Sequence, residues 1–174
     1  MDDNKIHSLC EEYGIKNYTI DEGLVCVDGE VNLDYRKSIN GSLPIHFGYA
    51  RGNFSCKGMG LTNLIGSPEI TGGWFDCRDN NLTSLEGCPI DVGTWFDCRK
   101  NNLTDLEGSP RMVDSYFNVG YNNLTTNYCE TIIGGVFQTT FREEGLEFTE
   151  ENYNNEAIKN FSWRTNLKKI KNRK

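Results

Sequence analysis

The sequence lacks the features of a membrane protein and of a disulfide-stapled secreted protein. None of its apolar runs approaches the roughly 18 residues that a membrane span needs. Prolines are few, at four, and the composition does not indicate disorder. The seven cysteines are an odd number without CxxC spacing, which favours reduced thiols. No basic segment followed by an apolar stretch opens the chain, so we expect a soluble, cytoplasmic protein.

Motifs for catalysis and metal binding are also missing. The chain contains no GxSxG, GxxxxGK[ST] or HExxH sequence, and no GxGxxG after a strand. Its two histidines, His7 and His46, stand in no ligand-like spacing. A catalytic carboxylate pair could be drawn from Asp76, Asp97 and Glu86, but nothing in the sequence marks them for that role. We therefore predict a protein that is not an enzyme, with no catalytic residues, metal or cofactor.

A 21-residue repeat dominates what is present. Phenylalanine and leucine recur at this offset in residues 54–68, 75–89, 96–110 and 117–125, and asparagine recurs in the last three of these copies. The copies at 75–89 and 96–110 have the spacing Φ-x-Φ-x-x-N-x-L-x-x-L, which is typical of leucine-rich repeats, and the other two follow it in part. A degenerate unit at 31–48 reads as an N-terminal capping repeat. The predicted fold is mainly β: a short leucine-rich-repeat solenoid with a parallel sheet on one face.

Side chains around each repeated phenylalanine alternate as in a strand with two faces. In the copy at 74–78, Phe75 and Cys77 are expected to point inward, and Trp74, Asp76 and Arg78 toward solvent. The cysteine position calls for a small apolar filler, so we predict core packing there and no metal site. The inward residues of this row are Cys56, Cys77, Cys98 and Val119.

The turn after each strand carries a repeated asparagine. Asn80, Asn101 and Asn122 are expected to form a ladder whose amides satisfy backbone groups that a sharp turn leaves unpaired. Beyond the leucines, a Gly-x-Pro begins the return path, and Cys88 in one such loop is expected to be exposed. A 21-residue unit leaves no room for a long helix, so this side should hold extended or short 3₁₀ segments.

The flanks predict caps at both ends of the solenoid. Apolar residues at helical spacing up to Tyr13 predict a short N-terminal helix that ends at Gly14. Two short apolar segments within residues 18–27, separated by a turn, predict a β-hairpin. Weaker helical patterns at 128–133 and 148–161 predict a C-terminal helical cap. The resulting division is an N-terminal helix and hairpin cap at 1–30, the solenoid at 31–126, and a C-terminal cap with a basic tail at 127–174.

The repeat F-D-C-x-x-N-N-L-T-S-L-E-G-x-P-x-x-V-G resembles leucine-rich-repeat-like proteins of tailed bacteriophages. The likeness covers residues 1–126 and includes the entry into the repeat array at 13–20, 27–33 and 43–48. It implies an architecture and carries over no catalytic residues. A phage origin would imply a role in host takeover, or in inhibition of an anti-phage defence system, by binding a bacterial protein.

The solvent-facing side of the strands is the predicted partner-binding surface. Successive strands bring equivalent residues into rows about 4.8 Å apart, and aromatic residues and arginine are frequent binding hot spots. Two other interpretations stay open, because an aromatic row also stabilises its own sheet and an acidic row can neutralise a basic one. The predicted contact residues are Trp74, Trp95, Tyr116, Asp76, Arg78, Asp97 and Arg99.

Charge separates the C-terminal segment from the rest. From Lys159 to Lys174 the chain has seven basic residues and no acidic one, whereas the whole chain has a net charge of −7. Binding of nucleic acid by the whole surface is therefore not expected, and the tail is an alternative nucleic-acid site. Self-assembly is a third possibility, and the sequence does not predict the oligomeric state. The candidate tail contacts are Lys168, Lys169, Lys171, Arg173 and Lys174.

Overall fold

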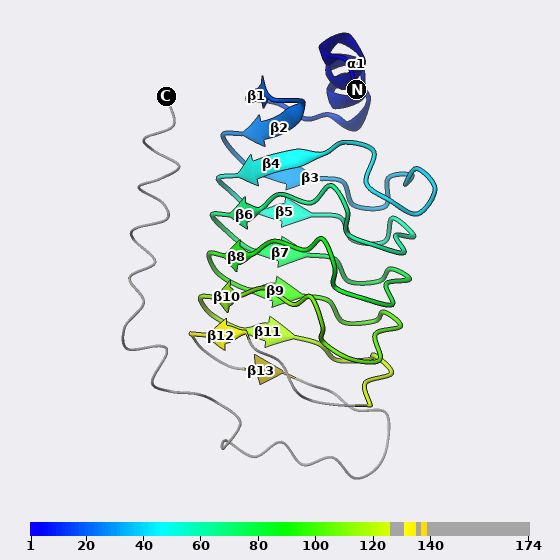
Figure 1. The fold of residues 1–174 in the computed structure, drawn as a ribbon, viewed down its shortest axis with the longest axis vertical. Helices are drawn as coiled ribbons and strands as arrows, with labels where there is room; N and C mark the ends of the chain where they lie inside the picture. The colour runs from blue at the N-terminus through cyan, green and yellow to red at the C-terminus, as the bar shows by residue number, and fades with distance from the viewer. Residues whose placement is uncertain (126–130, 135–136, 139–174) are drawn as a thin grey trace.

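The computed structural model describes residues 1–125, 131–134 and 137–138 (Figure 1). These residues form a β-solenoid in which each turn passes through one strand of each of two sheets. The N-terminal helix α1 (Asp3–Tyr13) and the hairpin of β1 (Tyr18–Asp21) and β2 (Leu24–Val27) lie at one end of the stack. The mainly β, parallel-sheet solenoid is thus confirmed.

Sheet B contains the strands that the repeat predicted. Its six strands are ordered β13-β11-β9-β7-β5-β3 and pair in parallel, with Phe75 beside Phe96. The strands are β3 (Val31–Asn32), β5 (Phe54–Ser55), β7 (Phe75–Asp76), β9 (Phe96–Asp97), β11 (Phe117–Asn118) and β13 (Phe137–Gln138).

Sheet A was not predicted: it occupies the return side, where extended or 3₁₀ segments were expected, so the single-sheet expectation is wrong. Its seven strands are ordered β1-β2-β4-β6-β8-β10-β12, and all pairs except β1–β2 are parallel. Most are two residues long, too short to show an alternating pattern. The remaining strands are β4 (Phe47–Ala50), β6 (Ile70–Thr71), β8 (Asp91–Val92), β10 (Met112–Val113) and β12 (Ile132–Ile133).

A tight arc joins the two sheets on every turn. Between β6 and β7 it consists of Gly72, Gly73 and Trp74. A Cβ on Gly72 would lie 2.1 Å from the carbonyl oxygen of Arg51 in the preceding turn, so a side chain at this position would force the backbone to shift. Gly72 N also donates a hydrogen bond to Ala50 O at 2.9 Å, which holds the two turns together.

The core lies between the sheets and the loop of repeated leucines. Phe54, Phe75, Phe96 and Phe117 are fully buried, and the first three rings stack in parallel at 5.3 Å. Burial of each such ring contributes about 2–3 kcal/mol. The inward cysteine row is buried beside them, as predicted: Cys56, Cys77 and Cys98 with Val119.

The predicted asparagine ladder is present. Asn101 Oδ1 accepts a hydrogen bond from Leu82 N at 3.0 Å, and its Nδ2 donates to Cys98 O at 2.9 Å and Cys77 O at 3.1 Å. Asn80 and the half-buried Asn122 repeat this arrangement. Each amide therefore joins two adjacent turns, because its partners lie on both.

The N-terminal cap matches the prediction. Asp2 accepts a hydrogen bond from Lys5 N at 3.0 Å and begins α1, and Gly14 ends it in the left-handed conformation. His7 Nδ1 lies 2.7 Å from the hydroxyl oxygen of Tyr18, which ties the helix to the hairpin.

The C-terminal end of the solenoid differs from the prediction of a helical cap. Residues 132–133 form strand β12, so the helical pattern at 128–133 was misleading there: this Ile-Ile pair continues sheet A beside Met112–Val113. The rest of the predicted C-terminal helical cap lies outside the described residues. So does the basic tail, with Lys168, Lys169, Lys171, Arg173 and Lys174.

Candidate partner-binding face

The predicted aromatic row is formed on the outer side of sheet B. Trp74, Trp95 and Tyr116 each directly precede a strand, so equal turns bring them into line. The ring centroids of Trp74 and Trp95 are 4.8 Å apart with planes at 8°, and those of Trp95 and Tyr116 are 5.8 Å apart at 13°. All three side chains are half-buried. The row therefore stabilises its own sheet and still presents aromatic surface to solvent.

The acidic row is buried, contrary to the expectation that it faces solvent. Asp76 and Asp97 are each only 2% exposed. Residues two positions before and after an aspartate share its face of the strand, so a tryptophan and an arginine flank each short carboxylate and cover it. Asp76 and Asp97 are consequently not available for direct contact with a partner.

The buried carboxylates shape the ends of the strands. Arg78 N donates to Asp76 Oδ1 at 3.1 Å, and Arg99 N donates to Asp97 Oδ1 at 3.2 Å. Asn118 repeats this turn with Gly120 N at 3.1 Å. A side chain that accepts from the backbone two residues later forms an Asx turn. The row therefore fixes the backbone where sheet B ends on each turn.

The arginines fold back over these carboxylates. Arg99 Nε lies 3.1 Å from Asp97 Oδ2, and Arg78 Nη1 lies 3.7 Å from the same oxygen. Arg78 Nε contacts Asp76 Oδ2 at 3.0 Å as an ion pair without hydrogen-bond alignment. The side chains of Arg78 and Arg99 are 28% and 34% exposed, whereas both carboxylates are 3% exposed. An approaching molecule thus meets the cations and not the anions.

Burial also changes the protonation of the two carboxyl groups. It raises the pKa of Asp76 to about 6, against the opposing effects of the Arg78 amide and guanidinium. Burial likewise raises the pKa of Asp97, opposed by the Arg99 amide and the two guanidinium groups. The negative charge of Asp76 beneath the arginines therefore diminishes as the pH falls toward 6.

A further row of residues, which directly follows the arginine row, was not predicted from the sequence. Asp79, Lys100 and Tyr121 follow Arg78, Arg99 and Gly120 and all have positive φ, between 55° and 57°. The carboxylate of Asp79 lies 3.5 Å from Lys100 Nζ. Gly58, at the equivalent position of an earlier copy, was the one sequence signal for this positive φ, and it has φ 65°.

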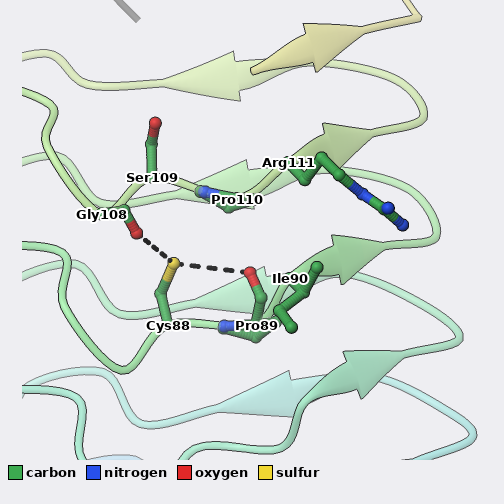
Figure 2. A pocket seen from close by; sticks show the side chains of 7 residues that line it. All are labelled: Cys88, Pro89, Ile90, Gly108, Ser109, Pro110 and Arg111. Carbon is green, nitrogen blue, oxygen red and sulfur yellow. Dashed lines mark hydrogen bonds between the residues drawn. The ribbon is translucent and has the colours of Figure 1, made fainter. Parts of the chain in front are cut away.

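A cavity of about 280 Å³ opens on the return side (Figure 2). The thiol of Cys88 donates to Gly108 O at 3.1 Å, and burial raises its pKa far above the ordinary value. Cys88 is half-buried rather than exposed, and its neutral thiol is a poor nucleophile. Arg111 points away from it and contacts Asp91 at 3.0 Å. The lining residues are Cys88, Pro89, Ile90, Gly108, Ser109, Pro110 and Arg111.

No family model, curated protein or solved structure matches the chain. Within residues 1–125, 131–134 and 137–138, no group of histidine, cysteine and acidic side chains is arranged to hold a metal ion. In the same part of the chain, no helix has the length and apolar character needed to cross a membrane. The sheet B face and the return-side cavity are thus the two surface features from which a function can be argued.

Proposed function

We propose that the chain is a non-catalytic protein-binding module that uses the outer face of sheet B. The observation that carries this proposal is the stacked, half-exposed row of Trp74, Trp95 and Tyr116 beside the accessible guanidinium groups of Arg78 and Arg99. Aromatic residues and arginine dominate the energetics of many protein interfaces. Stacking and ion pairing hold these side chains in place before binding, which lowers the entropy lost on association.

The contact set is smaller than the sequence predicted. Asp76 and Asp97 are buried, so we assign them to positioning of the arginines rather than to partner contact. Substitution of an aspartate should alter affinity only through the arginine above it, whereas substitution of an aromatic residue or an arginine removes a contact directly.

We assign the solenoid to the leucine-rich-repeat type because its repeat has that spacing and its asparagines form a ladder. The resemblance to tailed-phage proteins supports a bacterial host or anti-phage defence protein as the partner, with inhibition as the outcome of binding. This part of the proposal depends on the resemblance alone. The sheet B face supports a protein-binding role whatever the source of the partner.

The test is affinity capture from bacterial lysate with the full chain. The triple variant Trp74→Ala, Trp95→Ala and Tyr116→Ala, shown to be folded by circular dichroism, should lose a protein that the unmodified chain retains. Ile65→Ala, at a 52% exposed apolar residue outside this face, is the control and should retain it. If the triple variant does not fold, Tyr116→Ala alone replaces it. Equal capture by the variant and the control would refute use of this face.

A further inference from the structure

We infer that the sheet B face binds an acidic amphipathic helix of the partner, lying along the solenoid axis across β7, β9 and β11. The apolar stripe of this helix would contact Trp74, Trp95 and Tyr116, and its acidic side chains would reach Arg78 and Arg99. This inference rests on the proposed function. It adds the conformation and the charge of the bound segment.

Charge complementarity decides the sign of the partner. The accessible charges of the arginine row are cationic, because Arg78 and Arg99 cover the carboxylates of Asp76 and Asp97. On the adjoining row, the side chain of Lys100 is 58% exposed and pairs with Asp79, which is 30% exposed, so this row adds one cation and one anion. A basic segment would meet like charges and would find no exposed carboxylate in the acidic row. An acidic segment gains charge-assisted hydrogen bonds with guanidinium groups that are already oriented.

The spacing of the aromatic rings decides the conformation. Their centroids are separated by 4.8 Å and 5.8 Å, close to the pitch of an α-helix, about 5.4 Å. Apolar residues at i, i+4 and i+7 of a helix therefore stay in register with the three rings. Same-side residues of a β-strand recur at about 6.7 Å and fall out of register by the third ring. A polyproline II helix has a turn of about 9.3 Å and would meet only every second ring.

The width of the face also fits a helix. The aromatic residue and the arginine of one turn flank a two-residue strand and are four residues apart, which corresponds to about 13 Å for extended backbone. An α-helix with its side chains is about 10–12 Å wide. A helix that lies between the two rows therefore places one edge of its surface on the rings and the opposite edge over Arg78 and Arg99.

Single-stranded nucleic acid also combines anionic and planar groups, but the face suits it less well. The centroids of Trp74 and Trp95 are only 4.8 Å apart, so a base cannot insert between the two rings. A base inserted between two rings needs about twice the van der Waals contact distance of 3.5 Å.

The experiment uses fluorescence anisotropy with the full chain and four labelled probes. The first is a side-chain-stapled helical 15-mer with leucine at i, i+4, i+7 and i+11 and glutamate at the flanking positions. The second replaces every glutamate by lysine, the third carries a central proline in place of the staple, and the fourth is a 15-nucleotide oligothymidine. We expect a Kd on the order of 10 µM for the first probe. Binding of the other three should be at least tenfold weaker.

Variants of the protein locate the site. Arg99→Ala should weaken the first probe about tenfold, and 0.5 M salt should weaken it further, because screening shortens the reach of exposed charges. Arg111→Ala is the matched control: it also removes an arginine that contacts a buried aspartate, but on sheet A. It should bind as well as the unmodified chain.

Each contrary outcome overturns the inference at a defined point. Equal binding of the lysine probe refutes the charge argument, and equal binding of the proline probe refutes the helix. Oligothymidine binding that depends on Arg99 would make nucleic acid the ligand. If no peptide binds at 1 mM but lysate capture still depends on the aromatic row, the inference fails and the proposed function stands. If capture is also independent of that row, both fail.

Discussion

Removal of one side-chain amide of the asparagine ladder should cost far more stability than removal of the amide of the adjoining, exposed asparagine. In Asn101→Ala, Leu82 N loses its hydrogen bond to this side chain and has no other partner among the described residues, whereas Cys77 O and Cys98 O each lose one hydrogen bond and keep another from Asn80 or Asn122. A buried backbone group without a partner costs about 1–3 kcal/mol. We expect a loss of about 2–4 kcal/mol in the free energy of unfolding, from the unpaired amide of Leu82 and the two hydrogen bonds lost at the carbonyl groups. This is a large share of the 5–15 kcal/mol typical of a domain.

The adjoining residue provides the control for this prediction. Asn102 has the same side chain one position later, but it is exposed, and the hydrogen bond from its backbone N to Leu82 O at 2.8 Å survives truncation. Asn102→Ala should change stability by less than about 0.5 kcal/mol. Urea unfolding followed by circular dichroism measures both. Equal losses, or a loss below 1 kcal/mol in Asn101→Ala, would show that the ladder does not hold the turns together.

Three further substitutions have predicted outcomes. Asp76→Asn should stabilise the fold by about 1–2 kcal/mol at pH 7.5 and by little at pH 4. The raised pKa of about 6 means that the folded state favours the protonated form of Asp76. The stability that comes from protonation of Asp76 is complete below pH 4 and is lost as the pH rises through 6. A pH-independent difference in urea midpoints between the two proteins would contradict this. Gly93→Ala places a Cβ 2.3 Å from Gly72 O and should lower the Tm by more than 10 °C, whereas Gly29→Ala, with open space around it, should change the Tm by only a few degrees. Trp95→Ala, which removes two stacking contacts, should cost about 2–3 kcal/mol and still unfold in one cooperative step with urea.

The sequence predicted those features that depend on the offset of 21 alone. A constant offset places equivalent residues side by side in successive turns, whatever the shape of the turn. The phenylalanine and cysteine rows, the asparagine ladder and the aromatic row all follow from it, and the structure contains each of them. The N-terminal helix was predictable for a different reason, since Asp2 and Gly14 are strong local signals for its start and its end.

Sheet A was not predictable, because its strands are held by neighbouring turns rather than by their own pattern. Two residues such as Asp91–Val92 cannot show a period of two. Their extended conformation follows from backbone hydrogen bonds between turns, such as Gly93 N to Thr71 O at 3.0 Å. Such pairing is a property of the stack and becomes visible only when the turns are placed together.

The burial of Asp76 shows a second limit of sequence reasoning. Alternation correctly places this side chain on the outer face, on the same side as Trp74 and Arg78. Alternation does not give exposure, which depends on the size of the neighbours in both directions. In a stack with turns about 4.8 Å apart, a short side chain between a tryptophan and an arginine is covered from all sides. The face of a strand and contact with solvent are therefore separate predictions.

The size of the face limits what it can bind. Three turns about 4.8 Å apart and about 13 Å wide give a projected area on the order of 200 Å², whereas a stable interface between globular proteins needs about 800 Å² from each partner. The aromatic row ends at Asn53 on one side, and the arginine row ends at Gly120 on the other. A globular partner would thus have to extend its contacts over the row of Asp79, Lys100 and Tyr121. A single helix is matched to the area that Trp74 to Tyr116 provide, at the micromolar affinity expected of so small a contact.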